Sequence, residues 1–188
     1  MPEIIIESLD HEGRGVARQD GKTLFVEGAL PGERGTFSSY RRKPNYELAT
    51  AGRIIKPSSL RIEPRCRHFG ICGGCSMQHL DAPGQAAAKQ RVLEDAFWHI
   101  GRLRPETVYP AIQGSAWAYR SRARLSVRLV PKKGGVLVGF HEKRSSYIAD
   151  MDSCEVLPSA VSKLLPLLRR LVGALSVADR LPQIEVAV

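Results

Sequence analysis

Three of the four cysteines in this 188-residue chain lie in the segment CRHFGICGGC, from Cys66 to Cys75, and the fourth is the distant Cys154. The three local cysteines follow the spacing C-x5-C-x2-C. Four thiolates complete the tetrahedral ligand set of one metal centre, and a C-x-x-C pair lets two sulfurs reach it from a single turn. Gly73 and Gly74 leave room for backbone amides to point at sulfur. The pattern therefore predicts a site that fastens a remote part of the chain to this segment.

Two kinds of metal centre fit four cysteines, a structural zinc ion and an iron–sulfur cluster. Zinc sites usually consist of two C-x-x-C pairs, whereas three local ligands and one remote ligand are closer to ferredoxin-like cluster binding. The spacing favours the cluster, with zinc and unligated core thiols as the alternatives. We expect a structural role, because metal binding of this type contributes folding energy directly. A redox role is the alternative.

The sequence carries no sign of export or membrane insertion. Its start, MPEIIIESLDHEGRG, lacks the basic and apolar regions of a secretory signal. No run approaches the roughly 18 apolar residues that span a membrane. We therefore expect a cytoplasmic protein without a membrane partner, in which thiols stay reduced and cysteines act as metal ligands before disulfides.

Turn residues and hydrophobic periodicity divide the chain into a β-rich first part and a mixed second part. Residues 1–57 contain five strand-like runs separated by DHEG, QDG, ALPGE and KPN, which predicts a small closed or partly closed β-barrel. An open β-meander is the alternative. A polar, proline-bounded linker, residues 58–65, follows. The later elements are expected to be a helix over 83–103, strands over 118–130 and 136–148, a helix from Pro158 that bends or restarts at Pro166, and a final strand-like QIEVAV.

The charge balance points to a polyanionic partner. Lys and Arg number 28 against 19 Asp and Glu, which gives a net charge of +9. Clustered cations bind the phosphates of nucleic acids favourably, so such an excess of positive charge suits a nucleic-acid partner. In YRSRARLSVRLV the arginines recur with the period of a β-strand, so they share one face, while Ala123, Leu125, Val127 and Leu129 share the other. A solvated strand face with scattered salt bridges is the alternative.

The candidate RNA-binding residues of this region extend from the strand into the VPKKGG turn and FHEKR. They are Arg120, Arg122, Arg124, Arg128, Lys132, Lys133 and Lys143, with His141 and Arg144 beside them. In the barrel, Arg41, Arg42 and Lys43 lie between Tyr40 and Tyr46. OB-like barrels use this mixture of cations and rings to hold single-stranded RNA. The alternative is a basic hairpin tip that keeps the domain soluble.

Three stretches of the sequence closely resemble one known family. CRHFGICGGCSMQHL, YRSRARLSVRLVPKKGGVLVGFHEKRSSYIADMDSCEVL and IESLDHEGRGVAR resemble the cluster motif, the central domain and the N-terminal TRAM domain of 23S rRNA (uracil-5-)-methyltransferases of the RlmD type. The resemblance implies an OB-like, RNA-binding TRAM barrel. It also implies that Gln78 and His79 either contact RNA or hydrogen-bond to the loop. The implied ligands of a 4Fe–4S cluster are Cys66, Cys72, Cys75 and Cys154.

The family's reaction needs groups that this sequence does not offer. In that family a cysteine thiolate adds to carbon 6 of uracil, S-adenosylmethionine supplies the methyl group, and a base removes the proton on carbon 5. The scheme needs a free thiol and a Rossmann-like cofactor domain, whereas the cluster accounts for all four cysteines. The resemblance thus implies an α+β multi-domain parent enzyme whose methyltransferase domain is absent from this chain.

We therefore expect the RNA-targeting part of a methyltransferase that forms 5-methyluridine. Its domains would be a barrel at 1–57, a linker at 58–65 and a C-terminally truncated central α/β domain at 66–188. Alone it should bind 23S rRNA and a cluster as a monomer, without transferring methyl groups. The alternative is a stand-alone RNA-binding module with a structural zinc or iron–sulfur site. An electron-transfer ferredoxin is disfavoured by the net charge of +9.

Overall fold

The structure, a computed structural model, describes residues 3–188, and the chain divides into two compact units. The first unit comprises Met1–Glu63 and Ser76–Gln113, and the second comprises Pro64–Cys75 and Gly114–Val188. Each unit has its own hydrophobic core. Within residues 3–188, no helix is both long and apolar enough to cross a membrane.

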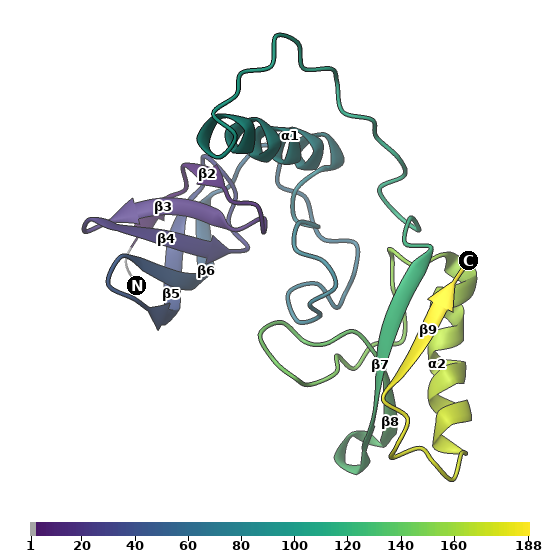
Figure 1. Ribbon diagram of the computed structural model, residues 1–188. Coiled ribbons are helices and arrows are strands. Elements are labelled where there is room, and N and C mark those ends of the chain that lie inside the picture. Colours follow the sequence, from purple (N-terminus) through teal and green to yellow (C-terminus); the bar gives the residue numbers. More distant parts are fainter. Residues whose placement is uncertain (1–2) are drawn as a thin grey trace. The chain divides into compact units, whose positions relative to one another are not determined.

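A six-stranded sheet forms the body of the first unit (Figure 1). The N-terminal segment supplies both of its edges, since β1 pairs with β5 while β2 pairs with β3. Residues 3–9 thus bond first to the β5 side and then to β3, which curls the sheet into a barrel and distinguishes it from an open meander. Its hydrogen-bonded order is β1-β5-β6-β4-β3-β2, antiparallel except for the parallel β4–β6 pair. The strands are β1 (Glu3–Ile5), β2 (Ser8–Leu9), β3 (Gly15–Gln19), β4 (Lys22–Glu27), β5 (Arg34–Arg42) and β6 (Tyr46–Lys56).

Alternate residues of each strand fill the barrel interior, as the two-residue period of β-structure dictates. Ala17 on β3 and Ala49 on β6 are completely buried beside larger side chains. A barrel of this size has little internal volume, so small residues at these positions let Phe37 from β5 enter the same core. The full buried set is Ile4, Ile6, Ala17, Leu24, Val26, Ala29, Phe37 and Ala49.

A buried ion pair holds the segment after the barrel, which the sequence indicated as a linker. The carboxylate of Glu33 is completely buried. It accepts hydrogen bonds from Arg61 Nε at 2.5 Å and Nη2 at 2.8 Å. The backbone amides of Leu30 and Ser58 donate to it at 2.8 and 3.1 Å. Burial acts to raise the pKa of Glu33, but these hydrogen bonds and the Arg61 charge outweigh it and lower the pKa.

Backbone hydrogen bonds extend this attachment to the region after the cysteines. The amide of Ile62 donates to the carbonyl of His79 at 3.0 Å, and the amide of Asp81 donates to that of Leu60 at 3.0 Å. These bonds explain why Ser76–Gln113 groups with the barrel, whereas the sequence-based boundaries placed it with the residues that follow.

Helix α1 (Ala82–His99) follows and is capped at its N-terminus by a side chain. The Asp81 side chain accepts a hydrogen bond from the amide of Gly84 at 2.8 Å, as an N-cap does. The helix ends earlier than the predicted 103, because Arg102 adopts a left-handed φ of 54° after Gly101. Gly84 is the one buried residue of α1.

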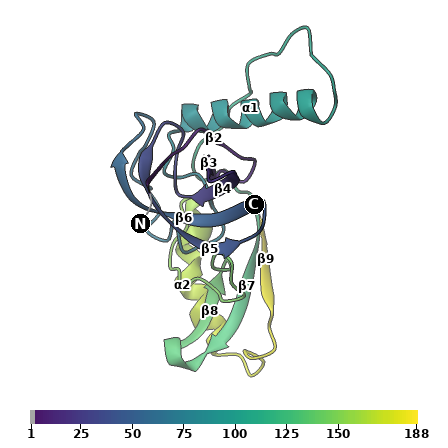
Figure 2. The same cartoon turned by 90° about the vertical axis from the view of Figure 1, so that its left-hand side faces the viewer.

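The second unit is a three-stranded antiparallel sheet with one helix alongside it (Figures 1 and 2). Its strands β7 (Arg122–Val130), β8 (Gly135–Gly139) and β9 (Gln183–Ala187) have the order β8-β7-β9. The short helix η1 (Pro131–Lys133) and left-handed Gly134, with φ of 81°, turn the chain between β7 and β8. Helix α2 (Ser159–Gly173) contacts β8 and buries Val161, Leu165 and Val172 in the same core as Leu125 and Val127 of β7.

The structure decides two details of the sequence prediction for the second unit. Helix α2 passes through Pro166 without restarting, and Pro166 is exposed. The strand predicted over 136–148 ends at Gly139. The loop that follows turns along the cysteine segment instead, with the amide of Gly73 donating to the carbonyl of His141 at 2.8 Å.

Candidate functional site

The segment from Cys66 to Cys75 is a series of tight turns without regular secondary structure. The amide of Phe69 donates to the carbonyl of Cys66 at 3.0 Å, and that of Cys72 donates to His68 at 2.9 Å. The amide of Gly74 points at a sulfur, with its nitrogen 3.4 Å from Cys72 Sγ. Amides directed at sulfur stabilise a thiolate, as the glycines of the motif suggested.

The remote Cys154 lies just before α2 and is buried. Its own amide donates to the hydroxyl of Ser162 on the first turn of that helix at 2.8 Å. The amides of Val156 and Leu157 act as hydrogen-bond donors to its sulfur. Cys154 is therefore held by the start of α2 and faces a pair of backbone donors.

The structure places all four cysteines in the second unit and gathers Cys72, Cys75 and Cys154 at one core. Burial raises the pKa of Cys72, and the charges of Cys75, Cys154 and Cys66 raise it further. Burial likewise raises the pKa of Cys154, with additional repulsion from Cys75 and Cys66. Independently of charge, Cys72 and Cys154 are buried in the same core, and Cys75 packs against that core. All four are free thiols in this structure.

Four converging thiols with backbone N–H donors have the donor chemistry of a thiolate-bound metal centre. Among residues 3–188, no three His, Cys, Asp or Glu side chains gather tightly enough to hold a single metal ion. A polynuclear cluster places a different iron at each cysteine, so it asks for a wider set of sulfurs than one zinc ion. The cluster and the zinc ion therefore both stay predictions.

Ion pairs brace the cysteine segment on both sides of Cys154. Arg65 Nε is 2.8 Å from a carboxylate oxygen of Glu155. Arg67 pairs with Asp152, and His68 Nε2 lies 3.5 Å from the same carboxylate. The hydrogen bond from Arg67 lowers the pKa of Asp152. These pairs join the stretch around Cys66 to the stretch around Cys154.

The arginines of β7 follow the alternation expected from the sequence. Arg122, Arg124 and Arg128 are exposed, while Leu125 and Val127 between them are buried toward α2. Arg124 pairs with Glu185 on the neighbouring β9 at 3.1 Å, and both line an open groove that includes Arg122. Leu129 departs from the pattern and is 42% exposed; it lies near the end of β7, beyond the residues that pair with β9.

The remaining candidates of the second unit lie outside the strand face. Lys132 and Lys133 are exposed on η1, where Lys133 lies 3.8 Å from Glu142. Lys143 lies over the ring of Phe69 at 5.3 Å, which places it against the cysteine segment. Arg120 precedes β7 and points to the same segment, with Nη2 3.2 Å from the carbonyl oxygen of Gly74. Exposed His141 lies 3.1 Å from the Ser126 hydroxyl, and Arg144 is exposed on the following turn.

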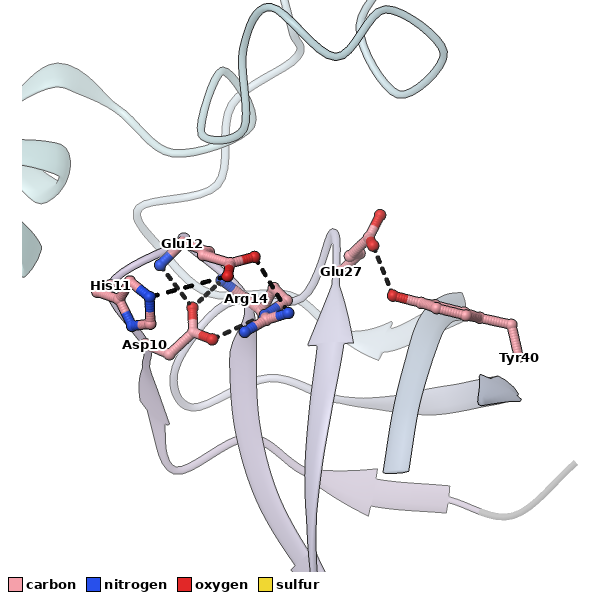
Figure 3. A network of polar contacts seen from close by, with 6 residues as sticks. All are labelled: Asp10, His11, Glu12, Arg14, Glu27 and Tyr40. Carbon is pink, nitrogen blue, oxygen red and sulfur yellow. Dashed lines mark hydrogen bonds and ion pairs between the residues drawn. The ribbon is translucent and has the colours of Figure 1, made fainter. Parts of the chain in front are cut away.

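In the first unit, the basic cluster of the barrel lies at the end of β5. Arg41, Arg42 and Lys43 are exposed. Tyr40 is 42% exposed and falls where the β5–β6 register shifts, so it is the extra residue of a β-bulge. Its hydroxyl donates to Glu27 at 2.7 Å, as Figure 3 shows. The hydrogen bond fixes an exposed ring beside three cations.

Gln78 and His79, which the family motif singles out, are not on the surface. Gln78 is 6% and His79 2% exposed. The backbone of His79 takes part in the pairing with Ile62 described above. Their placement supports a role in holding the loop.

The turn between β2 and β3 carries a network of charges and rings that the sequence analysis did not identify. Figure 3 shows Arg14 between two carboxylates, 2.7 Å from Asp10 and 3.1 Å from Glu12. Its guanidinium lies 5.0 Å from the centre of the Phe25 ring, which also meets Tyr46 edge-on at 6.1 Å. The DHEGRG stretch carries the charges, but only the barrel brings Phe25 and Tyr46 to them.

Comparison with known proteins gives matches along the whole chain. The model of the TRAM domain matches residues 2–35. The 23S rRNA (uracil(1939)-C(5))-methyltransferase RlmD of Aromatoleum aromaticum is 67% identical over 100% of this chain and 43% of its own length. The protein of the same name from Nitrosospira multiformis is 64% identical over 98% of this chain and 42% of its own length. The chain thus spans about two fifths of the length of these curated relatives.

A solved structure shares the fold. The crystal structure of Pyrococcus abyssi tRNA (uracil-54, C5)-methyltransferase in complex with S-adenosyl-L-homocysteine superposes with a TM-score of 0.60 at 23% identity. The match covers 90% of this chain and 36% of that one.

Proposed function

Because the resemblance to RlmD-type 23S rRNA uracil-C5-methyltransferases is confirmed over the whole chain, we propose that this chain is the RNA-targeting part of such an enzyme. The observation that carries the proposal is an identity of 64–67% to proteins of that name over nearly every residue. The full enzyme would form 5-methyluridine in 23S rRNA with S-adenosylmethionine as methyl donor. It would act in the cytoplasm as a monomer.

Cys66, Cys72, Cys75 and Cys154 would hold a 4Fe–4S cluster in the second unit, with zinc as the alternative. Support comes from the shared core of Cys72, Cys75 and Cys154 and from the amides directed at Cys72 and Cys154. When bound, the cluster would supply a cross-link between the cysteine segment and the start of α2. Since metal–thiolate bonds contribute folding energy, this role is structural.

The methyl transfer itself would use groups outside this chain. A nucleophilic cysteine needs a lowered pKa and access to substrate. Here burial raises the pKa of Cys72 and Cys154, the opposite of what a nucleophile requires. The other two thiols, Cys66 and Cys75, share the same site. This chain would therefore bind RNA without methylating it.

Two surfaces would contact RNA, one in each unit. On the sheet of the second unit, Arg122, Arg124 and Arg128 present guanidinium groups suited to phosphates. On the barrel, exposed Tyr40 would stack on an unpaired base beside Arg41 and Arg42. Lys43, Lys132 and Lys133 would add charge around them.

Anaerobic purification of the chain, followed by iron and acid-labile sulfide assays and titration with a 23S rRNA fragment, tests the proposal. We expect iron and sulfide in equal amounts, loss of both on Cys154→Ser, and RNA binding that weakens with salt. If the chain instead contains stoichiometric zinc and no sulfide, the cluster is wrong and the centre is the alternative, a zinc ion. A chain that binds neither metal nor RNA would contradict the proposed function.

A further inference from the structure

Arg120 differs from the other arginines of its stretch in where its side chain points. The sequence pattern assigns it to the same strand face as Arg122 and Arg124. In the structure it precedes β7, is half-buried, and turns toward the cysteine segment. Exposure on the strand face supports phosphate binding by Arg122. The same argument does not apply to Arg120.

The guanidinium of Arg120 contacts the turn between two of the cysteines. Its Nη2 donates to the carbonyl of Gly74 at 3.2 Å. The amide of the same Gly74 points at Cys72 Sγ at 3.4 Å, and the next residue is Cys75. Arg120 thus holds the carbonyl of Gly74, while the amide of Gly74 is directed at the candidate ligand Cys72.

An aromatic ring completes the contact. The guanidinium carbon of Arg120 lies 5.3 Å from the centre of the Phe140 ring. The same ring packs against Gly74, where a Cβ would come within 3.1 Å of Phe140 Cδ2. A flat, delocalised cation can stack on the ring and donate at its edge at the same time, which an ammonium cannot.

The backbone of Arg120 reaches the other half of the site. Its amide donates to the carbonyl of Val156 at 2.8 Å. The amide of Val156 in turn is a donor to the sulfur of Cys154. One residue therefore binds the Cys72–Cys75 turn through its side chain and the Cys154 segment through its backbone.

We propose that Arg120 is a positioning residue of the four-cysteine centre, which sets the Gly74 peptide so that Cys72 and Cys75 face Cys154. The inference rests on the proposed metal centre for its function, but the geometry that it describes exists in the metal-free chain. Partners that orient ligands from outside typically matter about 10- to 100-fold for metal affinity. We expect an effect of that size on iron retention.

The first experiment uses the metal-free full chain with Arg120→Ala, Arg120→Lys and the matched control Arg122→Ala. The rate at which iodoacetamide alkylates each cysteine is followed by mass spectrometry. Arg120→Ala should speed alkylation of Cys72 and Cys75, because their turn is released, whereas Arg122→Ala should match the unchanged chain. Arg120→Lys keeps the positive charge but lacks the planar guanidinium that stacks on Phe140. Its alkylation rates should lie between those of Arg120→Ala and Arg122→Ala.

The second experiment reconstitutes the same chains anaerobically and follows iron release to a chelator. Arg120→Ala should hold iron about 10- to 100-fold more weakly, with Arg122→Ala unaffected. Alkylation and iron release that are unchanged in Arg120→Ala, together with weaker RNA binding, would overturn the inference and return Arg120 to the RNA-binding surface. If Arg120→Ala does not fold, the same comparison is made with Arg120→Lys.

The two proposals fail in different ways. If the chain without any substitution takes up neither iron nor zinc, the proposed metal centre is contradicted. The alkylation rates would still decide whether Arg120 orders the cysteine turn.

Discussion

At the scale of single residues, Glu33 has the most demanding environment in the first unit. It is completely buried, and three of its hydrogen-bond partners come from the loop before β5 and the segment after β6. A buried carboxylate is tolerated only when its charge is compensated, and Arg61 supplies that compensation. Glu33 therefore determines where the segment after the barrel attaches.

Replacing Glu33 by Gln should lower the free energy of unfolding of the first unit by about 3 kcal/mol, because Arg61 loses its charged partner. The pKa of Glu33 is lowered below 4.5, its ordinary value, so its stabilisation is present above that pH. It is lost as the pH falls through the folded-state pKa. Urea unfolding of both chains at several pH values should show a difference that shrinks on acidification.

Glu3→Gln is the matched control. Glu3 makes an exposed pair with Arg34 at 3.9 Å, and such pairs contribute little. Equal effects of the two substitutions at neutral pH would contradict the role given to Glu33.

At the scale of elements, β7 separates two functions on its two faces. Leu125 and Val127 pack toward α2, while Arg122 and Arg124 face away from it. Because successive side chains of a strand lie on opposite faces, β7 can contribute to the core with one face and expose cations on the other. The exposed face is shared with Glu185 of β9, which orients Arg124.

Replacing both Arg122 and Arg124 by Ala should weaken binding of a 23S rRNA fragment and flatten its salt dependence. Two lost phosphate contacts correspond to a change of about 1.4 in the slope of log K against log salt for single-stranded RNA. Binding titrations at several salt concentrations measure it.

Lys163→Ala with Arg170→Ala removes the same charge from exposed positions of α2. That pair should leave the slope nearly unchanged. Similar slopes for the two double variants would mean that only net charge matters and that the β7 face is not the contact.

At the scale of the whole molecule, the two units depend on different forces. The barrel closes around its own apolar core, and an ion pair with a buried carboxylate attaches the segment that follows it. The second unit includes Cys72 and Cys154 in its core, and its irregular segment is also held by ion pairs. We therefore expect the proposed metal to order the second unit and to leave the barrel unaffected.

Removing the metal from a reconstituted chain should reduce amide protection from hydrogen exchange in Pro64–Cys75 and around Cys154, and leave the barrel strands protected. Hydrogen-exchange mass spectrometry before and after chelation measures this. Cys154→Ser should reproduce the metal-free pattern. Barrel protection lost in parallel would show that the units do not have separate stabilities.

The sequence by itself determined the local features. The period of two in YRSRARLSVRLV, the turns of the barrel and the cysteine spacing all depend on neighbouring residues, so the strands and the basic face could be predicted. The tertiary structure alone decided which distant groups meet. Arg61 reaches Glu33 across 28 positions, and Arg120 reaches Gly74 across 46. Contacts of this kind are set by how the sheets close and the loops pack, and no local pattern encodes them.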